Sequence, residues 1–344
     1  MPNETLSDAI NKVCRGEELA EDEAAGVLRE VMEGRASPEE TAGLLIALRT
    51  RGETADEIAG LARTMREHAT KVEVGIDGLV DTAGTGGGTP TFNVSTTAAF
   101  VAAGAGCPVA KHGNRSATSQ CGSADVLEAL GARIDLGPEQ VADCIETVGF
   151  GFMFAPQHHA AMKHVVPVRK ALGVRTIFNL LGPLTNPADA PNQVIGVSDG
   201  PFLEHMAMAL ARLGGQSALV VSSEDGLDEI SISAPTRVVE LRDGKVEAYT
   251  VTPEDLGVER APIDAIAFGA PEENARITRD VLAGADKGAA LSLTLVNAGA
   301  AVYAAGKADS LEAGVGVAAE AVQSGAANDL MERFVSRTQE LAAA

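Results

Sequence analysis

The stretch DTAGTGGG, Asp81 to Gly88, follows the strand-like run Leu79-Val80 and precedes a helical run that starts at about Thr96. Glycines let a backbone pass close to a ligand and turn successive N–H groups toward it. The hydroxyls of Ser95-Thr96 and the dipole of the next helix would add to this, so the stretch predicts a phosphate or diphosphate site. It matches neither GxGxxG nor Walker A, which argues against a dinucleotide or an NTP. A tight turn without a ligand is the alternative.

From about residue 73 onward the sequence alternates between strand-like and helical runs. Strands separated by helices predict an α/β fold with a mostly parallel sheet. Asp243-Gly244 then predicts a hairpin turn between two further strands, and residues 272–344 return to helical patterns. The remaining strand-like runs are Val109-Ala110, Phe152–Phe154, Gln193–Val197 and Ala218–Val221.

Residues 1–70 show only helical patterns. Ser37-Pro38-Glu39-Glu40 and Thr54-Ala55-Asp56-Glu57 have the form of capping boxes at helix starts. Leu44, Leu45 and Leu48 between them have the spacing of one apolar helix face. We therefore expect a helical N-terminal part. The stretch 156–190 is rich in His and Pro, and we expect it to be a crossover that returns to this part and lines a cleft.

A second polar motif, KHGNRS, Lys111 to Ser116, follows the next strand-like run. Ligands of open α/β sheets lie beyond the carboxyl ends of the strands, so this motif should share one rim with the glycine loop. Lys111 and Arg115 would supply the cations that an anion needs there. A solvated loop is the alternative for the motif, and a packed histidine is the alternative for His112.

A third motif, DGLDE, Asp225 to Glu229, follows the strand-like run Ala218–Val221. Adjacent carboxylates at a strand end suit a hard cation such as Mg²⁺, which takes oxygen ligands and bridges them to substrate phosphates. A solvated turn is the alternative for an isolated Asp-Glu pair. The sequence shows no nucleophile elbow and no zinc motif, so we expect bond breaking to depend on positioning and charge.

The composition narrows the classes of partner. The chain has 344 residues, 48 of them acidic and 27 basic, for a formal net charge of −21. A field of this sign repels phosphate backbones, so no nucleic acid is expected as a partner. Without an apolar run of membrane length or a signal peptide, we expect a cytoplasmic protein with no membrane partner. The four cysteines have no metal-ligand spacing, and we expect reduced thiols.

The motifs GTGGG, NVST, KHGNRS, NLLGPLTNP and DGLDE, in this order, closely resemble those of anthranilate phosphoribosyltransferases of the tryptophan pathway, over nearly the whole chain. The resemblance implies a nucleoside phosphorylase/phosphoribosyltransferase type of fold, with a small all-helical domain and a larger α/β domain. It implies transfer of phosphoribosyl from 5-phosphoribosyl 1-diphosphate to the amine of anthranilate, with Mg²⁺ as cofactor and pyrophosphate as product. The helical domain, residues 1–72 and 164–190, would form a homodimer, and residues 73–163 and 191–344 would form the α/β domain.

The same resemblance implies roles for individual residues. Ser95, Asp228 and Glu229 would bind magnesium. Anthranilate would contact Asn114 and Arg169, with Arg169 facing its carboxylate, and its site would also include Gly84, His112, Pro156 and His159. The donor would contact residues of all the loops above, namely Gly84, Gly87, Gly88, Thr91, Asn93, Ser95, Thr96, Lys111, His112, Gly113, Asn114, Arg115, Ser116, Ser119 and Ser123.

The glycine loop departs from the family pattern at one point. The family usually has GTGGD followed by a further glycine, whereas this chain has GTGGG, with Gly88 last, and a loop one residue shorter before Thr91-Phe92-Asn93. The missing carboxylate normally lies near the donor and the metal. We therefore expect an altered magnesium dependence rather than a loss of activity.

Two other functions are compatible with parts of the sequence. A pyrimidine nucleoside phosphorylase would share the fold and the chemistry at ribose C1, but it would not need Asp228 and Glu229 as metal ligands. A non-catalytic, nucleic-acid-binding relative would need a basic surface. KHGNRS and NLLGPLTNP argue against the first alternative, and the net charge argues against the second. Transfer to another carboxylated aromatic amine also stays open, because Arg169 specifies a carboxylate and no particular ring.

Overall fold

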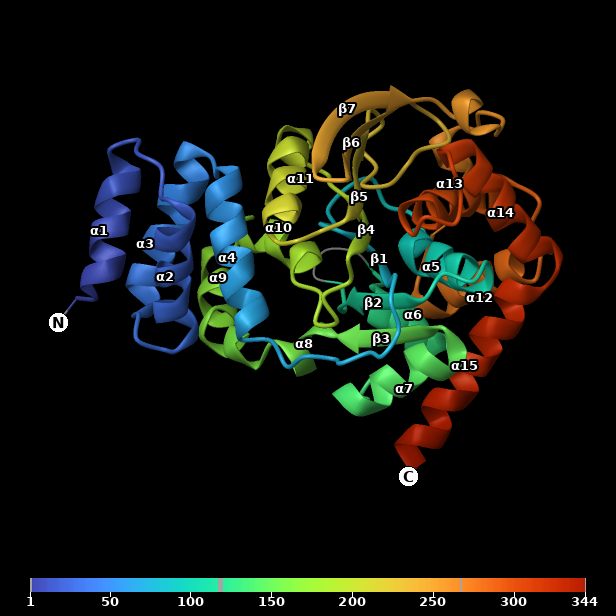
Figure 1. The fold of residues 1–344 in the computed structure, drawn as a ribbon, viewed down its shortest axis with the longest axis horizontal. Helices are drawn as coiled ribbons and strands as arrows, with labels where there is room; N and C mark the ends of the chain where they lie inside the picture. Colours follow the sequence, from blue (N-terminus) through green and yellow to red (C-terminus); the bar gives the residue numbers. More distant parts are fainter. Residues whose placement is uncertain (1, 117–119, 267, 344) are drawn as a thin grey trace.

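Figure 1 shows the computed structural model of the protein, which describes residues 2–116, 120–266 and 268–343. The N-terminal part is helical, as expected. Hydroxyls of Ser37 and Thr54 accept the N–H groups of Glu40 and Glu57, and the two carboxylates bond back to the capping residues. Both capping boxes are therefore real. The four helices are α1 (Glu4–Cys14), α2 (Glu21–Met32), α3 (Pro38–Arg51) and α4 (Ala55–Glu67).

The α/β part contains a seven-stranded sheet in the order β3-β2-β1-β4-β5-β6-β7. The first five strands in this order are parallel, and β6 and β7 form an antiparallel hairpin. Asp243 and Gly244 both have positive φ, 52° and 74°, as a two-residue hairpin turn requires. The mostly parallel α/β fold is thus confirmed. The strands are β1 (Val80–Gly84), β2 (Val109–Gly113), β3 (Phe150–Phe154), β4 (Asn192–Gly196), β5 (Ser217–Ser223), β6 (Thr236–Arg242) and β7 (Lys245–Val251).

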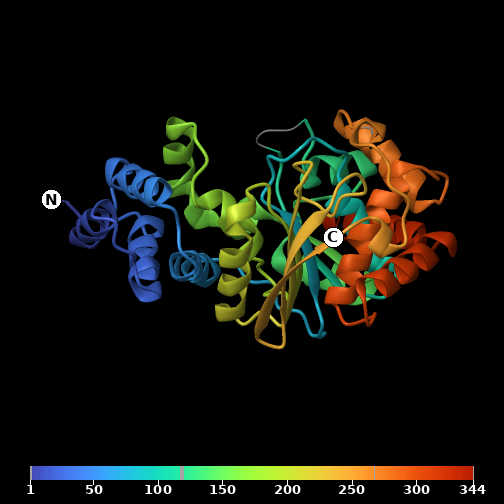
Figure 2. The same ribbon diagram turned by 90° about the horizontal axis from the view of Figure 1, so that it is seen from above.

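Helices cover both faces of the sheet, and each face has its own core. Leu219 and Val221 of β5 join the core that contains Phe100 and Phe334, whereas the alternate residue Val220 joins the core of the N-terminal helices. Figure 2 shows the N-terminal helices and the red C-terminal helices at opposite ends of the molecule. Apart from the short helices between β3 and β4, the helices after β1 are α5 (Val94–Gly104), α6 (Ser123–Leu130), α7 (Pro138–Val148), α11 (Leu203–Arg212), α12 (Pro271–Leu282), α13 (Ala289–Ala304), α14 (Leu311–Gln323) and α15 (Ala326–Ala343).

The crossover between β3 and β4 returns to the N-terminal helices. Its residues Val168 and Phe178 share a core with Leu28 and Ile58, and Arg66 of α4 donates to the carbonyl of Leu184 at 2.7 Å. The crossover thus packs against the helical part, while the exact domain boundaries stay a prediction. Its short elements are α8 (Ala155–His158), η1 (Ala160–His164), α9 (Val166–Leu172), α10 (Phe178–Leu181) and η2 (Gly182–Leu184).

The remaining elements are short 3-10 turns, and none of them lies inside the sheet. Helices in the described part of the chain are all too short or too polar to cross a lipid bilayer. The other turns are η3 (Gly200–Phe202), η4 (Glu254–Leu256) and η5 (Ile263–Ala265).

Candidate active site

The polar motifs meet at one edge of the sheet. Parallel strands β1, β2, β4 and β5 end at this edge. The glycine loop and DGLDE follow β1 and β5, and KHGN forms the last three residues of β2 and the residue after them. The first strand, β1, lies between β2 and β4, where the order of the sheet reverses. In open α/β sheets this reversal is the usual place for a ligand. The prediction of a shared rim is therefore confirmed.

The glycine loop is held directly against the acidic loop, which is the segment Asp225 to Glu229 after β5. The N–H of Gly86 donates to Oδ2 of Asp228 at 2.9 Å, and the N–H of Thr89 donates to the carbonyl of Gly226 at 2.9 Å. Gly86 and Gly87 have φ values of +66° and +85°, which side chains other than glycine rarely adopt. The loop therefore presents bare backbone next to a carboxylate, as a diphosphate with a bridging cation would need.

Three glycines make room for Asp228. A Cβ on Gly196 would lie 1.6 Å from the Asp228 carbonyl oxygen, and one on Gly84 would lie 2.9 Å from Oδ2 of Asp228. On Gly88 it would lie 2.6 Å from the Gly226 carbonyl and 2.7 Å from Oδ1 of Asp228. The shortened loop thus packs so tightly against the acidic loop that position 88 has no space for a side chain in this arrangement.

Helix α5 begins at Val94, earlier than the expected start at about Thr96, so Ser95 and Thr96 lie in its first turn. The Thr97 N–H bonds to the Asn93 carbonyl and continues the helix at this end. The amide oxygen of Asn93 accepts the amide of Asn274 at 3.0 Å, which fixes this residue from α12. N–H groups of a first helical turn lack partners within the helix, so this end suits an anion. Nearby, the Thr91 hydroxyl donates to the Phe92 carbonyl at 3.0 Å.

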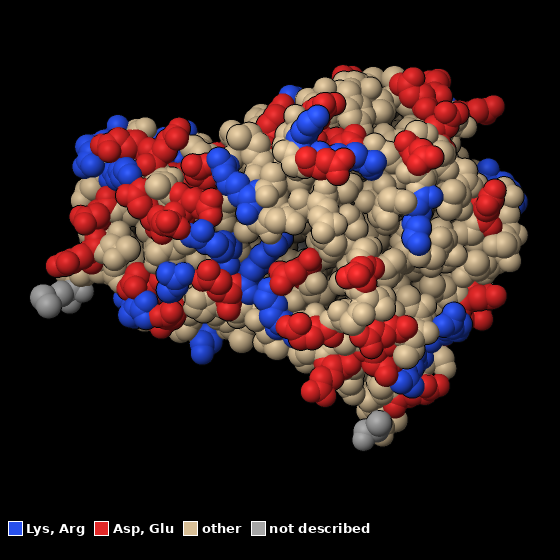
Figure 3. Space-filling model, viewed as in Figure 1, with Lys and Arg blue, Asp and Glu red and all other residues tan. Residues whose placement is uncertain are grey.

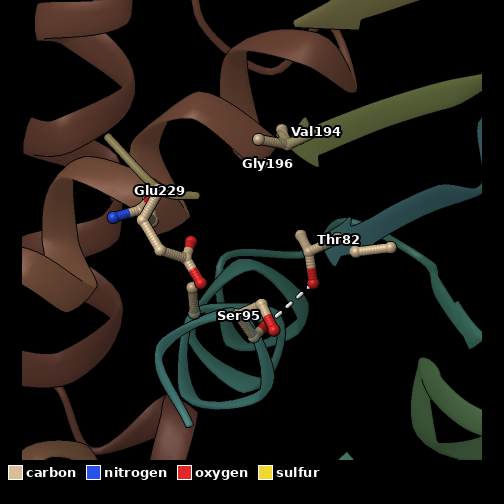
Figure 4. A pocket seen from close by; sticks show the side chains of 8 residues that line it. Thr82, Ser95, Val194, Gly196 and Glu229 are labelled. Atoms are coloured by element: carbon tan, nitrogen blue, oxygen red, sulfur yellow. Dashed lines mark hydrogen bonds between the residues drawn. The ribbon is translucent and has the colours of Figure 1, made fainter. Parts of the chain in front are cut away.

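A small cavity of about 10 Å³ lies between α5, β1, β4 and the acidic loop, roughly the room of one water molecule. Figure 4 shows the Glu229 carboxylate pointing toward the Ser95 end of α5. The hydroxyl of Thr82 donates to the Ser95 carbonyl at 2.8 Å and holds that helix end. The cavity is lined by Thr82, Ala83, Ser95, Ala98, Val194, Gly196, Glu229 and Asn297.

Lys111, in β2, is 1 % exposed, and its side chain is buried between β1 and the start of α5. Its ammonium donates to the Thr82 carbonyl at 2.5 Å and lies 3.4 Å from the Ser95 hydroxyl. Burial lowers its pKa, while the nearby carboxylates of Asp81 and Glu229 oppose this change. The structure thus puts one buried cation against the helix end and the acidic loop, where it can offset part of the charge of an anion.

The carboxyl groups of Asp228 and Glu229 both have pKa values above their ordinary range, whereas hydrogen bonds from three serines keep the pKa of Asp225 low. Burial raises the pKa of Asp228, and burial followed by repulsion from Asp228 raises the pKa of Glu229 to about 8. A positive ion nearby would oppose both rises. Within the described ranges, no group of three His, Cys, Asp or Glu residues could hold a metal alone. Two carboxylates and the Ser95 hydroxyl fit Mg²⁺, because this ion keeps waters and takes further oxygens from substrate phosphates.

The loop after β2 folds back over the start of α6. The carbonyl of Asn114 accepts the Ser123 hydroxyl at 3.2 Å, and a Cβ on Gly113 would lie 2.2 Å from that hydroxyl oxygen. Arg115 forms ion pairs with Asp125 at 2.7 Å and Glu128 at 2.5 Å, so its charge is already matched. Ser116 lies next to this turn and donates its N–H to Asp125. Ser119 lies outside the described residues.

The two histidines expected in the acceptor site lie close together, and one of them, His112, belongs to β2. The rings of His112 and His159 are 5.1 Å apart, and both side chains are buried. Burial and the neighbouring histidines hold the pKa of His112 well below its usual range, and burial lowers the pKa of His159 to about 4. Both rings are therefore neutral at pH 7 and suit an aromatic ligand. Pro156, in α8, is exposed.

Arg169, in α9, has an unmatched charge. Its guanidinium carbon lies 5.6 Å from the centre of the Phe178 ring, and burial lowers its pKa. The described residues give it no carboxylate partner, unlike Arg115. A half-buried guanidinium next to an aromatic face is a suitable site for a planar carboxylated ring. On the face shown in Figure 3, basic side chains gather near the boundary between the helical and α/β parts.

Four residues of this region were not predicted from the sequence. Gly196 admits Asp228, Asn297 lines the cavity and bonds to the backbone of Ile230, and Arg175 donates to the Gly86 carbonyl. Asn186 bonds to both Asp81 and the Ala110 carbonyl. Each of them acts through a contact between segments far apart in the chain, which the neighbouring sequence does not reveal. Only Asn186 could have been found from the sequence, because it lies in the motif NLLGPLTNP.

Comparisons with known proteins agree with this geometry. Residues 7–69 match the helical bundle domain of a glycosyl transferase family, and residues 76–328 match its a/b domain. The anthranilate phosphoribosyltransferase of Rubrobacter xylanophilus is 55% identical over 98% of both chains. The chain belongs to the anthranilate phosphoribosyltransferase family. The small helical domain and larger α/β domain implied by the sequence motifs are those of this family.

Solved structures of family members superimpose on the whole fold. The enzyme of Thermus thermophilus has a TM-score of 0.91 at 50% identity and covers 96% of this chain and 99% of its own. The enzyme of Saccharomyces cerevisiae, solved in complex with PRPP and Mg, has a TM-score of 0.88 at 28% identity over 98% of both chains. The family assignment therefore covers both domains, and it favours a phosphoribosyltransferase over the phosphorylase and nucleic-acid-binding alternatives.

Proposed function

We propose that the chain transfers the phosphoribosyl group of 5-phosphoribosyl 1-diphosphate to the amine of anthranilate and releases pyrophosphate. The observation that carries the proposal is the contact between the Gly86 N–H and the Asp228 carboxylate. It brings a backbone anion site and a cation-binding carboxylate to one point, and a diphosphate with its metal ion needs both.

The donor would occupy the edge of the sheet between the glycine loop and the first turn of α5. N–H groups of the loop and the hydroxyls of Ser95 and Thr96 would bind its phosphates. Ser95, Asp228 and Glu229 would hold Mg²⁺, which when bound supplies positive charge to the leaving diphosphate. Lys111, buried against Ser95, would add a second positive charge without reaching the solvent.

Anthranilate would lie between the loop after β2 and the crossover. Arg169 would bind its carboxylate with a planar fork of two N–H groups, and the neutral rings of His112 and His159 would line the route to the ribose. The amine of anthranilate is neutral at pH 7 and attacks C1 as this carbon becomes cation-like. The transfer therefore depends on residues that hold the two substrates in line, and it needs no strong base.

We also propose that residues 1–72 and 164–190 form a helical domain that pairs two chains. A groove between α1 and α3 supports this proposal, because it is lined mainly by apolar side chains, and Ile46 there is 38% exposed. Ile46→Asp should convert the dimer into a monomer in light-scattering measurements. The apolar lining of the groove includes Ile10, Val13, Ala42, Ile46 and Ala47.

The proposed activity is tested by following anthranilate fluorescence after addition of the donor and Mg²⁺. We expect fluorescence to fall with the wild-type protein, and to stay nearly constant with Arg169→Ala or without the metal. The same preparations are assayed for thymidine phosphorolysis. Thymine formation without anthranilate consumption would replace the proposal with a phosphorylase activity.

A further inference from the structure

Arg175 connects the helical part of the molecule to the glycine loop. It lies between α9 and α10, and its Nη1 donates to the Gly86 carbonyl at 3.1 Å. Its own carbonyl accepts a hydrogen bond from Arg49 of α3, so the backbone that carries it is tied to the helical bundle. A Cβ on Gly87 would lie 2.1 Å from Nη1 of Arg175. The guanidinium therefore lies directly on the part of the loop where bare backbone is presented.

The charge of Arg175 is available to an anion. Within the described ranges its guanidinium bonds to the neutral Gly86 carbonyl and forms no ion pair, and the side chain is exposed. Its charge also opposes the rise in the pKa of the nearby Asp228 carboxyl. The other cations near the loops are less available to a ligand. Arg115 is paired with two carboxylates, and Lys111 is buried and donates to the Thr82 carbonyl. A guanidinium has five N–H donors in a planar fork, which matches two phosphate oxygens at once.

We infer that Arg175 binds the diphosphate of the donor from the helical side, exchanging the Gly86 carbonyl for diphosphate oxygens. The inference rests on the proposed function and adds a donor-binding residue to it. Because α3 holds the backbone of Arg175, this contact also makes donor binding depend on how closely the helical part approaches the glycine loop. An arginine from the crossover would then bind the leaving group, while Arg169 of the same crossover binds the acceptor.

The test is calorimetric titration of inorganic pyrophosphate with Mg²⁺ into the wild-type protein, Arg175→Gln, Arg175→Lys and the control Lys170→Ala. Gln retains an N–H donor for the Gly86 carbonyl but has no charge, so it separates a structural hydrogen bond from binding of the anion. Lys keeps the charge but loses the fork. Lys170 is an exposed cation of α9, so its removal tests the general effect of one positive charge.

We expect affinity for magnesium pyrophosphate to fall about 10-fold or more in Arg175→Gln, as for lost hydrogen bonds to charged groups. Arg175→Lys should be intermediate, and Lys170→Ala should stay within about twofold of the wild type. In steady-state assays the KM for the donor should rise, with the KM for anthranilate little changed. Wild-type affinity in Arg175→Gln would overturn the inference. Binding is measured without anthranilate, so a wild-type protein that binds pyrophosphate but transfers nothing would count against the proposed function alone.

Discussion

Asn186 and Asp81, 105 residues apart in the chain, share a buried hydrogen bond of 2.8 Å from Nδ2 to Oδ2. The same amide donates to the Ala110 carbonyl at 2.8 Å, and the other oxygen of Asp81 accepts the His112 N–H at 3.2 Å. One carboxylate thus joins the strand of the glycine loop, the start of KHGN and the end of NLLGPLTNP. Burial raises its pKa to about 6, so the ionised form depends on these donors and on Lys111.

Replacing Asn186 by Ala should weaken both the fold and donor binding. The change leaves a buried carboxylate and a buried carbonyl each without one donor, which costs about 1–3 kcal/mol. Urea unfolding followed by circular dichroism measures this loss. Asn328→Ala is the control, because the Asn328 amide bonds only to Glu332 at the surface. Equal stability of the two variants would show that the hydrogen bonds from Asn186 to Asp81 and Ala110 do not stabilise the fold.

Replacing Gly196 by Ala should impair magnesium-dependent activity. The new Cβ would overlap the Asp228 carbonyl oxygen at 1.6 Å, so the acidic loop must shift. We expect activity to fall at least ~100-fold, since displacement of a reacting group by about 1 Å can cost this much. Gly200→Ala is the matched control, because its nearest neighbours would lie at 3.8 Å and 3.9 Å. Full activity of Gly196→Ala would show that the close contact between Gly196 and the Asp228 backbone is not needed for activity.

The effect of the missing loop carboxylate requires a pair of variants at Gly88. Any side chain there meets Gly226 and Asp228, so Gly88→Asp changes both the packing and the charge. Gly88→Ala reproduces the steric part, and the difference between the two variants isolates the carboxylate. We expect the activity-versus-magnesium curve of Gly88→Asp to be displaced from that of Gly88→Ala. Superimposable curves would refute a role of charge at this position.

Arg169→Lys should raise the KM for anthranilate about 10- to 100-fold, because Lys keeps the charge but lacks the planar fork. The KM for the donor should change little. Initial rates from anthranilate fluorescence, with each substrate varied in turn, give both constants. A rise in the KM for the donor alone would show that Arg169 binds the donor and not anthranilate.

Glu30 should contribute to stability near neutral pH and lose this contribution in acid. Hydrogen bonds from Arg35 and then from Asn3 lower its pKa from an ordinary value of 4.5 to about 2. A lowered pKa in the folded state gives stability that is complete above pH ~4.5 and disappears as the pH falls toward ~2. The Tm of Glu30→Gln should therefore lie below that of the wild type at pH 7 and approach it near pH 2. The exposed residue Glu39, changed to Gln, is the control.

The sequence predicted much of the fold because its signals are local. Capping boxes at Ser37 and Thr54 and the turn at Asp243-Gly244 each lie within a few adjacent residues. Helix α5 begins at Val94, before the predicted start at about Thr96, and its N-cap residue Asn93 uses its side chain to contact Cys121 and Asn274 rather than to cap the helix. Motifs at the ends of parallel strands also located the site, since the topology alone brings them to one edge.

Other features of the site could not be predicted, because they depend on contacts between distant segments. Nothing near Arg175 in sequence indicates that it reaches Gly86, and nothing near Gly196 indicates that Asp228 needs its space. Nor does the motif KHGNRS reveal that Arg115 is already paired with Asp125 and Glu128. Charge alone therefore overstated the number of free cations in that loop.

The most direct test of the account is a crystal structure with 5-phosphoribosyl 1-diphosphate and Mg²⁺ bound. The account predicts the diphosphate on the backbone of Gly86 and Gly87, and the metal between the diphosphate and the carboxylates of Asp228 and Glu229. A diphosphate bound away from this edge of the sheet, with both carboxylates unengaged, would contradict it.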